Sequence, residues 1–399
     1  MNKREKKIMG LTIGSHSLVH LFEGVLPPLI PLLITEFSTD YFHMGLVVTV
    51  FSYAFGLGSL PAGILADKFG PRRLVSIYLF GAGLSAILVW PVNTLWSYGI
   101  IMGVIGMCCS TYHPASNTLI SLSMANKGHA FGIHGIAGSL GVAGVPVLSA
   151  FIGSIFGWRA PHVLYGLIGI FLGVYSLSVA EHRAPSIGGS DGQSNTAGLD
   201  RKTFLTIIIF FLSATALGMS YKGIMTFLPI YMGTRVNLGV MNLNTVTLGG
   251  TIATLALTSG AVGQYLAGRL VDRHSAERLY LGAVVIGMIC VFVMSFSTNV
   301  LLVVSAVIYA FFYFSTQPIQ NYLISRYLPE HRHGLGYGIH FFLSFGVGST
   351  AAAISGYIAD QVGLEAVFIF MGLCFFMSAC MVVLLVLRKK GVTPISLPT

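Results

Sequence analysis

The chain has 399 residues, of which 54% are hydrophobic and only 9% are charged, and its mean hydropathy is +0.80. Soluble globular proteins carry about 25% charged residues, so this composition excludes that class and indicates an integral membrane protein. The net charge of +9 gives no support for a nucleic-acid partner, because an excess of basic residues is typical of the cytoplasmic loops of membrane proteins.

Long apolar segments predict twelve transmembrane helices, since roughly 20 residues are needed to cross the hydrocarbon core. We expect an all-α membrane protein with helices near 9–35, 44–66, 74–91, 96–122, 129–155, 162–180, 203–232, 244–271, 279–297, 299–326, 335–361 and 364–387. The stretch 181–202 is rich in Gly, Ser and charged residues, which favours a flexible cytoplasmic linker. The predicted parts are an N-terminal six-helix bundle (1–180), this linker, and a C-terminal six-helix bundle (203–399).

The first predicted helix contains "HSLVHLFEGVLPPLIP", residues 16–31, in which three polar residues interrupt an apolar span. His16, His20 and Glu23 follow the i, i+4, i+7 spacing that places side chains on one helical face. Burying an unpaired carboxylate is costly, so Glu23 is expected to face a wet cavity, to find a partner or to be protonated. Lys222 is the only lysine within an apolar segment, and we expect it to be that partner.

Two interpretations of these four residues are open. In the first, Glu23, Lys222, His20 and His16 line a central cavity and carry proton coupling or bind the substrate. In the second, Glu23 and Lys222 form a static buried ion pair.

Polar pairs recur in two other predicted helices. His113 and Asn117 share one face of the fourth helix by their i, i+4 spacing, and Gln317 and Asn321 hold the matching positions in the tenth. These side chains either face the substrate cavity or hydrogen-bond neighbouring helices beside the prolines of both segments. The pattern favours neither interpretation over the other.

Three further residues are candidates for the cavity wall. His134 and His340 hold equivalent positions in the fifth and eleventh helices, where either packing or an interface between the halves is compatible with the pattern. Tyr221 precedes Lys222 and is a candidate for an aromatic lining, although aromatic residues at helical spacing are more often packing residues.

The two halves of the chain repeat each other in three places, in the same order and at a nearly constant offset. The matched segments are "AGILADKFGPRRLV" (62–75) with "AGRLVDRHSAERLY" (267–280), "HPASNTLIS" (113–121) with "QPIQNYLIS" (317–325), and "FGIHGIAGSLG" (131–141) with "YGIHFFLSFGVG" (337–348). Such self-similarity indicates a duplicated six-helix unit. Because the matched helices have the same orientation, the repeats are parallel, and a ligand site is expected between the halves near the membrane midplane.

The basic residues predict the orientation. With twelve helices in place, only Arg159 and Arg235 fall on one side of the membrane, and Lys222 lies within a helix. The other side receives Lys3, Arg4, Lys6, Lys7, Lys68, Arg72, Arg73, Lys127, Arg183, Arg201, Lys202, Arg269, Arg273, Arg278, Arg326, Arg332, Arg388, Lys389 and Lys390. By the positive-inside rule that side is cytoplasmic, and so are both termini.

The connection between the second and third helices, "GILADKFGPRR", resembles the loop motif of the major facilitator superfamily. The resemblance implies a cytoplasmic gate in which Asp67 pairs with a neighbouring helix end and the arginines of the motif hold the two halves together. The alternative is that the basic residues of the motif only set the membrane topology. The motif positions are Gly63, Leu65, Asp67, Gly70, Arg72 and Arg73, with Asp272 and Arg273 in the second copy.

Within this superfamily, "HSLVHLFEGVLPPLIPLL" and "YHPAS" are most similar to the fosmidomycin-resistance type of bacterial efflux protein. The chain departs from that type at Val19-His20, where a polar-acidic pair is expected, and at Glu23, which replaces an uncharged residue. The segment "GSLGVAGVP" (138–146) resembles the helix-5 motif of drug–proton antiporters but places Pro146 after Val145 instead of after a glycine. This last departure argues against export.

The favoured hypothesis is a proton-coupled secondary transporter of the bacterial inner membrane that exports small anionic or amphipathic compounds by alternating access. The alternative is a proton symporter that takes up an organic anion such as a carboxylate. A non-transporting sensor on a transporter fold is a third class, which titratable residues in the pore disfavour.

The chain is expected to act as a monomer whose partners are the substrate, protons and the lipid bilayer. No Walker loop is present, so we expect the proton gradient to supply energy and no cofactor to be needed. The cysteines lack CxxC spacing and no catalytic cluster is evident, so the sequence predicts neither a metal site nor an enzyme.

Overall fold

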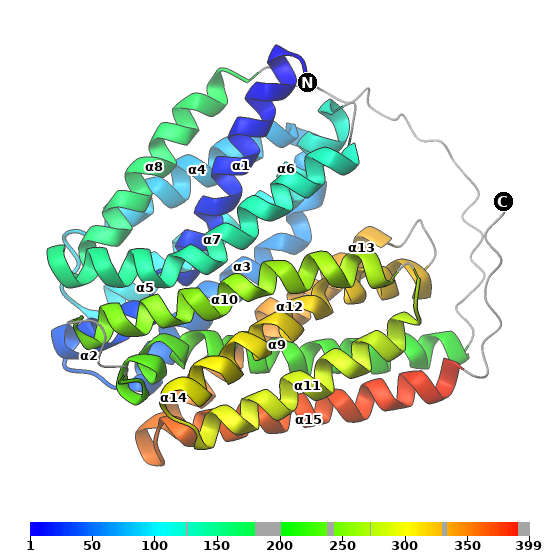
Figure 1. Ribbon diagram of the computed structural model, residues 1–399. Coiled ribbons are helices and arrows are strands. Elements are labelled where there is room, and N and C mark those ends of the chain that lie inside the picture. The colour runs from blue at the N-terminus through cyan, green and yellow to red at the C-terminus, as the bar shows by residue number, and fades with distance from the viewer. Residues whose placement is uncertain (125–126, 180–200, 238–242, 272, 329–332, 390–399) are drawn as a thin grey trace.

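The computed structural model describes residues 1–124, 127–179, 201–237, 243–271, 273–328 and 333–389. Within these ranges the chain is helical and contains no strand. Figure 1 shows two helical bundles lying side by side. The N-terminal half comprises α1 (Lys3–Gly24), η1 (Pro27–Leu29), α2 (Ile30–Phe37), α3 (Tyr41–Phe69), α4 (Pro71–Ile87), α5 (Leu95–Cys109), α6 (Tyr112–Ser123), α7 (Lys127–Phe156) and α8 (Arg159–Leu177).

The C-terminal half begins after the predicted linker, of which residues 181–200 lie outside the described ranges. Its elements are α9 (Arg201–Arg235), α10 (Thr245–Val271), α11 (Ala276–Phe296), α12 (Asn299–Tyr327), α13 (His333–Phe341), η3 (Phe342–Gly346), η4 (Val347–Ser349), α14 (Thr350–Gln361) and α15 (Leu364–Lys389). We call the end of the molecule at which α1 begins and α15 ends the proximal end, and the opposite end the distal end.

The predicted fold class is confirmed, and each of the twelve expected segments corresponds to one helix or to a broken helix. Eleven spans within the described residues are long and apolar enough to cross a membrane. The remaining segment is α4, which has 17 residues. At 1.5 Å per residue it is about 26 Å long, slightly shorter than the hydrocarbon core of about 30 Å.

Two segments predicted as continuous helices are broken at prolines. In the first, α1 ends at Gly24 and a 3₁₀ turn, η1, begins at Pro27, because Pro27 and Pro28 lack the N–H groups that would continue the helix. In the fourth, Pro114 cannot donate to the carbonyl of Ser110, and α5 ends just before this point. The Ser59 hydroxyl donates to the Phe55 carbonyl at 2.7 Å and lies 3.5 Å from the Ser110 carbonyl.

The eleventh segment is also broken, although it contains no proline. Its centre is the π-helical η3 followed by the 3₁₀ turn η4. A Cβ on Gly348 would lie 2.8 Å from the carbonyl carbon of Gly218 in α9, and a Cβ on Gly56 of α3 would lie 2.8 Å from the Cα of Gly346. Backbones of three helices thus meet at this break, and π segments of this kind often occur at functional sites.

The two halves contact each other along two seams, α3 with α14 and α7 with α10. At the distal end of the first seam, the carboxylate of Asp360 accepts the backbone N–H groups of Tyr41 and Phe42 at 3.0 and 2.8 Å. Asp360 thereby caps the N-terminus of α3 from the other half. On the second seam, the hydroxyls of Ser154 and Thr247 are 2.9 Å apart. The distal end is therefore closed.

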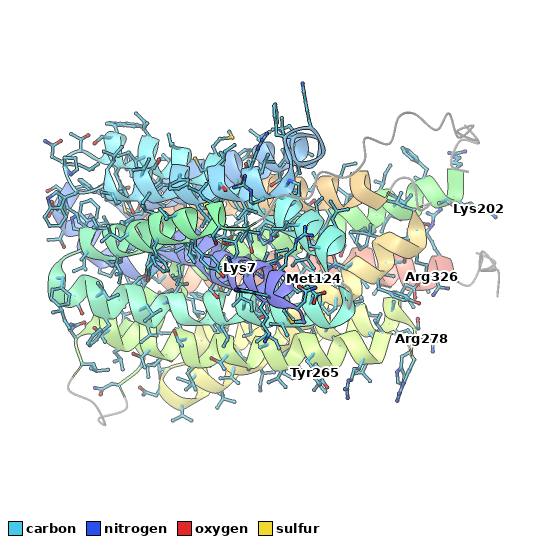
Figure 2. All side chains as sticks on the ribbon, turned by 90° about the horizontal axis from the view of Figure 1, so that it is seen from above. Lys7, Met124, Lys202, Tyr265, Arg278 and Arg326 are labelled. Carbon is cyan, nitrogen blue, oxygen red and sulfur yellow. The ribbon has the colours of Figure 1, made fainter. Side chains whose placement is uncertain are left out.

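The halves diverge toward the proximal end, as Figure 1 shows for α6 and α9. In Figure 2 the basic side chains Lys202, Arg278 and Arg326 gather at one end of the C-terminal half. This grouping follows the charge asymmetry in the sequence, and the cytoplasmic location of the proximal end stays a prediction of the positive-inside rule.

We expect a cysteine introduced by Ser194→Cys to react with a membrane-impermeant thiol reagent only in inverted vesicles, because residue 194 lies in the predicted cytoplasmic linker. Labelling of intact cells and of vesicles, read by mass shift, measures this. The matched control is Val362→Cys in the distal connection, where Val362 is 75% exposed; it should be labelled in intact cells. Labelling of Ser194→Cys in intact cells would reverse the orientation.

Candidate functional site

A cavity of about 240 Å³ lies between the two halves. Its walls come from α1, α6 and α7 on one side and from α9, α12 and the broken eleventh segment on the other. In α1 and α9, which begin at the proximal end, the lining residues His16, His20, Leu217 and Gly218 precede Glu23 and Lys222. The cavity therefore lies on the proximal side of these two charged residues.

Glu23 and Lys222 form an ion pair that joins the halves at the floor of this cavity. The Lys222 ammonium donates to Oε1 of Glu23 at 2.6 Å, and the two side chains are 6% and 13% exposed, respectively. The other carboxylate oxygen, Oε2, lies 3.1 Å from Nδ1 of His20. The pairing expected from the sequence is present, and both oxygens of the buried carboxylate have partners, as burial requires.

A second, smaller cavity of about 50 Å³ lies on the distal side of the ion pair. Lys222 lines only this cavity, whereas Glu23, His20 and Tyr221 line both. Its remaining wall includes Pro27, Pro28, Pro146 and Pro229. The Glu23–Lys222 pair thus lies between a proximal cavity and a distal one.

Four histidines cluster in the N-terminal half beside Glu23. Nδ1 of His16 lies 2.6 Å from the carbonyl oxygen of His134, and the two rings stack at 4.0 Å between centroids. The ring of His113 lies edge-on to His16 at 5.3 Å and 5.7 Å from that of His20. His16, His20 and His113 line the cavity, whereas His134 is buried behind them. For His134 this is the packing position, one of the two that the sequence left open, and its carbonyl supports His16.

The polar residues of the tenth segment take part in a chain of hydrogen bonds between the halves. Ser139 of α7 donates to Oε1 of Gln264 in α10 at 2.9 Å, and Nε2 of Gln264 donates to Oε1 of Gln317 in α12 at 2.6 Å. Gln317 and Asn321 both line the cavity, which is one of the two positions that the sequence left open. Gln264 was missed, although a glutamine within an apolar segment is the kind of signal that points to a cavity.

Asn117 does not take the cavity-facing position, one of the two that the sequence left open. It is exposed on α6 and is not among the residues that line the cavity. His113 faces the cavity one helical turn earlier, and the matching Asn321 of the other half does line the cavity.

The wall formed by the C-terminal half is largely aromatic. Tyr221 lines the cavity and stacks on Tyr313 at 4.8 Å between ring centroids. The Lys222 ammonium lies 5.4 Å from the centre of the Phe345 ring, within the range of a cation–π contact. His340 also lines this wall and is 8% exposed. The cavity therefore has a histidine-rich face and an aromatic face, with a lysine beneath.

The predicted gating motif lies at the proximal end. Gly70 joins α3 to α4 with φ +92°, a conformation that favours glycine, and Arg72 and Arg73 occupy the first turn of α4. Arg273 lies in the connection after α10. The surroundings of Gly63, the side chain of Asp67 and all of Asp272 lie outside what the structure describes, so the gate stays a prediction.

Comparisons with known proteins agree with this architecture. A family model described as Major Facilitator Superfamily matches residues 12–353 and 242–398. The fosmidomycin resistance protein of Escherichia coli (strain K12) is 23% identical over 90% of this chain and 88% of its own length. A probable L-galactonate transporter of the same organism is 24% identical over 59% of this chain, and that match spans only 55% of the relative.

Among solved structures, a bacterial homolog of the human lysosomal transporter Spinster, in an inward-facing and occupied conformation, covers 98% of both chains with a TM-score of 0.77. Its sequence identity is 13%, so this likeness shows the fold alone.

We expect Lys222→Met to lower the free energy of unfolding by about 3–5 kcal/mol, because it leaves the Glu23 carboxylate buried without its cation. The double variant Glu23→Gln with Lys222→Met should be more stable than Lys222→Met alone, since no charge is then stranded. Chemical unfolding of the four proteins of this double-mutant cycle in detergent measures the coupling.

The matched control is the cycle on Arg159 and Glu36, a pair 2.9 Å apart whose side chains are 25% and 40% exposed. Its coupling should be about 0–1 kcal/mol. Simple additivity at Glu23 and Lys222 would show that these two residues do not stabilise each other.

Proposed function

The chain belongs to the Major Facilitator Superfamily, and on that premise we propose that it is a proton-coupled secondary transporter of small organic anions. It works by alternating access in a bacterial inner membrane, as a monomer, with the proton gradient as its energy source. The proximal cavity then opens to the cytoplasm. The observation that carries the proposal is the ion pair of Glu23 and Lys222, 2.6 Å apart across the two halves.

The ion pair supplies a cation for the substrate and a carboxylate for the proton. While Glu23 is ionised, it holds the Lys222 ammonium, whose side chain is only 6% exposed. A proton on Glu23 removes this attraction, and the freed ammonium then needs another anion, because an unpaired charge at this depth is costly. A carboxylate or phosphonate that enters the cavity can supply it.

This exchange couples the proton and the anion in the same direction. The anion binds well only when Glu23 is protonated, so both are carried together, which is symport. With neither bound, the closed ion pair has no net charge, and the empty carrier can reorient through the low-dielectric core at lower cost than with a stranded charge. The geometry therefore supports uptake of an organic anion better than the export favoured by the sequence patterns.

Export is the second candidate, because the fosmidomycin resistance protein matches 90% of the chain. In a proton antiporter the substrate and the proton must compete for one group. In this protein that group would be Glu23. A substrate that competes directly with the proton for the Glu23 carboxylate would carry a positive charge, and any other substrate would compete with the proton only indirectly. The two candidates thus differ in the direction of proton movement relative to the substrate.

We expect purified protein in proteoliposomes to accumulate an anion against its gradient when the outside is made acidic, and to carry protons in with it. The probes are a panel of small carboxylates and phosphonates that includes L-galactonate and fosmidomycin. Glu23→Gln should abolish proton-driven accumulation and keep anion exchange, because the uncharged amide leaves Lys222 free without titrating.

The matched control is Glu36→Gln at the distal surface, where Glu36 pairs with Arg159; it should transport as the parent protein does. Proton movement opposite to the substrate would support export instead. Full proton-driven accumulation by Glu23→Gln would remove Glu23 from the coupling step.

A further inference from the structure

Three cavity histidines in the N-terminal half offer nitrogen atoms to a common centre. One ring nitrogen each of His16, His20 and His113 can be chosen so that the three atoms all lie within 4.8 Å of one another. His16 and His20 come from successive turns of α1, and His113 comes from the start of α6. Linear spacing predicts no metal site here, because the third histidine is far away in the sequence.

Hydrogen bonds at Nδ1 leave the Nε2 atoms of two of these rings available as ligands. A carbonyl oxygen can only accept, so Nδ1 of His16 must donate its proton to the His134 carbonyl, 2.6 Å away. Nδ1 of His20 donates in the same way to the Glu23 carboxylate at 3.1 Å. A neutral imidazole that donates through Nδ1 presents a lone pair at Nε2.

This pattern is the one that metal-binding histidines show. Their second ring nitrogen almost always donates to a carbonyl or a carboxylate, which fixes the tautomer and raises the basicity of the ligand. His16 has the carbonyl, and His20 has the carboxylate. Lys222 holds the other oxygen of Glu23 at 2.6 Å, so the supporting carboxylate is itself oriented.

We propose that His16, His20 and His113 form a binding site for a divalent transition-metal ion of the kind that imidazole prefers, such as Zn²⁺, Ni²⁺ or Co²⁺. Three protein nitrogens leave a fourth position open in a tetrahedral site. All three residues line the cavity, so this position faces it and accepts water or a ligating group of a cavity solute.

The ring nitrogens have to draw closer together to hold an ion. Metal–nitrogen bonds of about 2.0–2.1 Å place the ligands of a tetrahedral site about 3.3 Å apart, compared with separations of up to 4.8 Å here. His113 follows the break between α5 and α6, where the backbone can adjust. Because all three ligands belong to the N-terminal half, rocking of one half against the other leaves the site intact.

The site can be tested by metal binding alone, without any transport assay. The full-length protein, purified in detergent with a tag that contains no histidine and stripped with a chelator, is titrated with Co²⁺. We expect stoichiometric binding with the intense visible absorption of a four-coordinate ion and displacement by Zn²⁺. Zn²⁺ should also raise the melting temperature, because it binds only the folded state.

His113→Ala and the more conservative His20→Gln should each weaken Co²⁺ binding at least tenfold and abolish the Zn²⁺-dependent rise in melting temperature. The matched control is His340→Ala, which removes a histidine from the same cavity on the opposite wall; it should bind Co²⁺ as the parent protein does. Size-exclusion chromatography verifies that each variant is folded.

Failure of the parent protein to bind Co²⁺ would overturn the proposal and leave the cluster as a group of hydrogen-bonding histidines. Binding that persists unchanged in both cluster variants, or that is lost equally in His340→Ala, would also overturn it.

Discussion

The ion pair between Glu23 and Lys222 is the contact on which the organisation of the cavity depends. Its side chains are only 6% and 13% exposed, and at such depth two charges attract strongly but are costly to bury separately. Both oxygens of the Glu23 carboxylate need a partner. Lys222 from the other half provides one, and His20 from the same helix provides the other. The Glu23 side chain thereby connects the two halves, the histidine cluster and the floor of the cavity.

The backbone around this pair is irregular, and the irregularities place its partners. α1 ends at Gly24, immediately after Glu23, and the eleventh segment changes to η3 where Phe345 approaches Lys222. α6 starts anew at the proline break, which carries His113 into the cavity. In a membrane such breaks are tolerated only where the freed groups are buried in protein or face water, and here they surround the cavity.

Much of this arrangement could be predicted from the sequence, because the strongest constraint was visible there. Glu23 and Lys222 are charges of opposite sign inside apolar segments, where an unpaired charge is costly. The twelve segments follow from apolar length. These inferences need only composition, spacing and the repeat.

Other features depend on contacts that spacing cannot reveal. The π segment at Phe342–Gly346 contains no proline and arises where glycines let three backbones meet. Asp360 caps α3 from the other half of the chain. The cluster of His16, His20 and His113 requires the approach of α6 to α1. The exposure of Asn117 also cannot be predicted from spacing, because His113 on the same predicted helical face does line the cavity.

The central claim is that a proton on Glu23 and an anion on Lys222 are bound together, and proton uptake on ligand binding tests it most directly. Purified protein in weakly buffered detergent solution, monitored with a pH indicator, is mixed with an anion that the proteoliposome assay has identified as a substrate. The account predicts that the parent protein takes up protons from solution as the anion binds, whereas Glu23→Gln takes up none. Release of protons, or anion binding without any proton exchange by the parent protein, would contradict it.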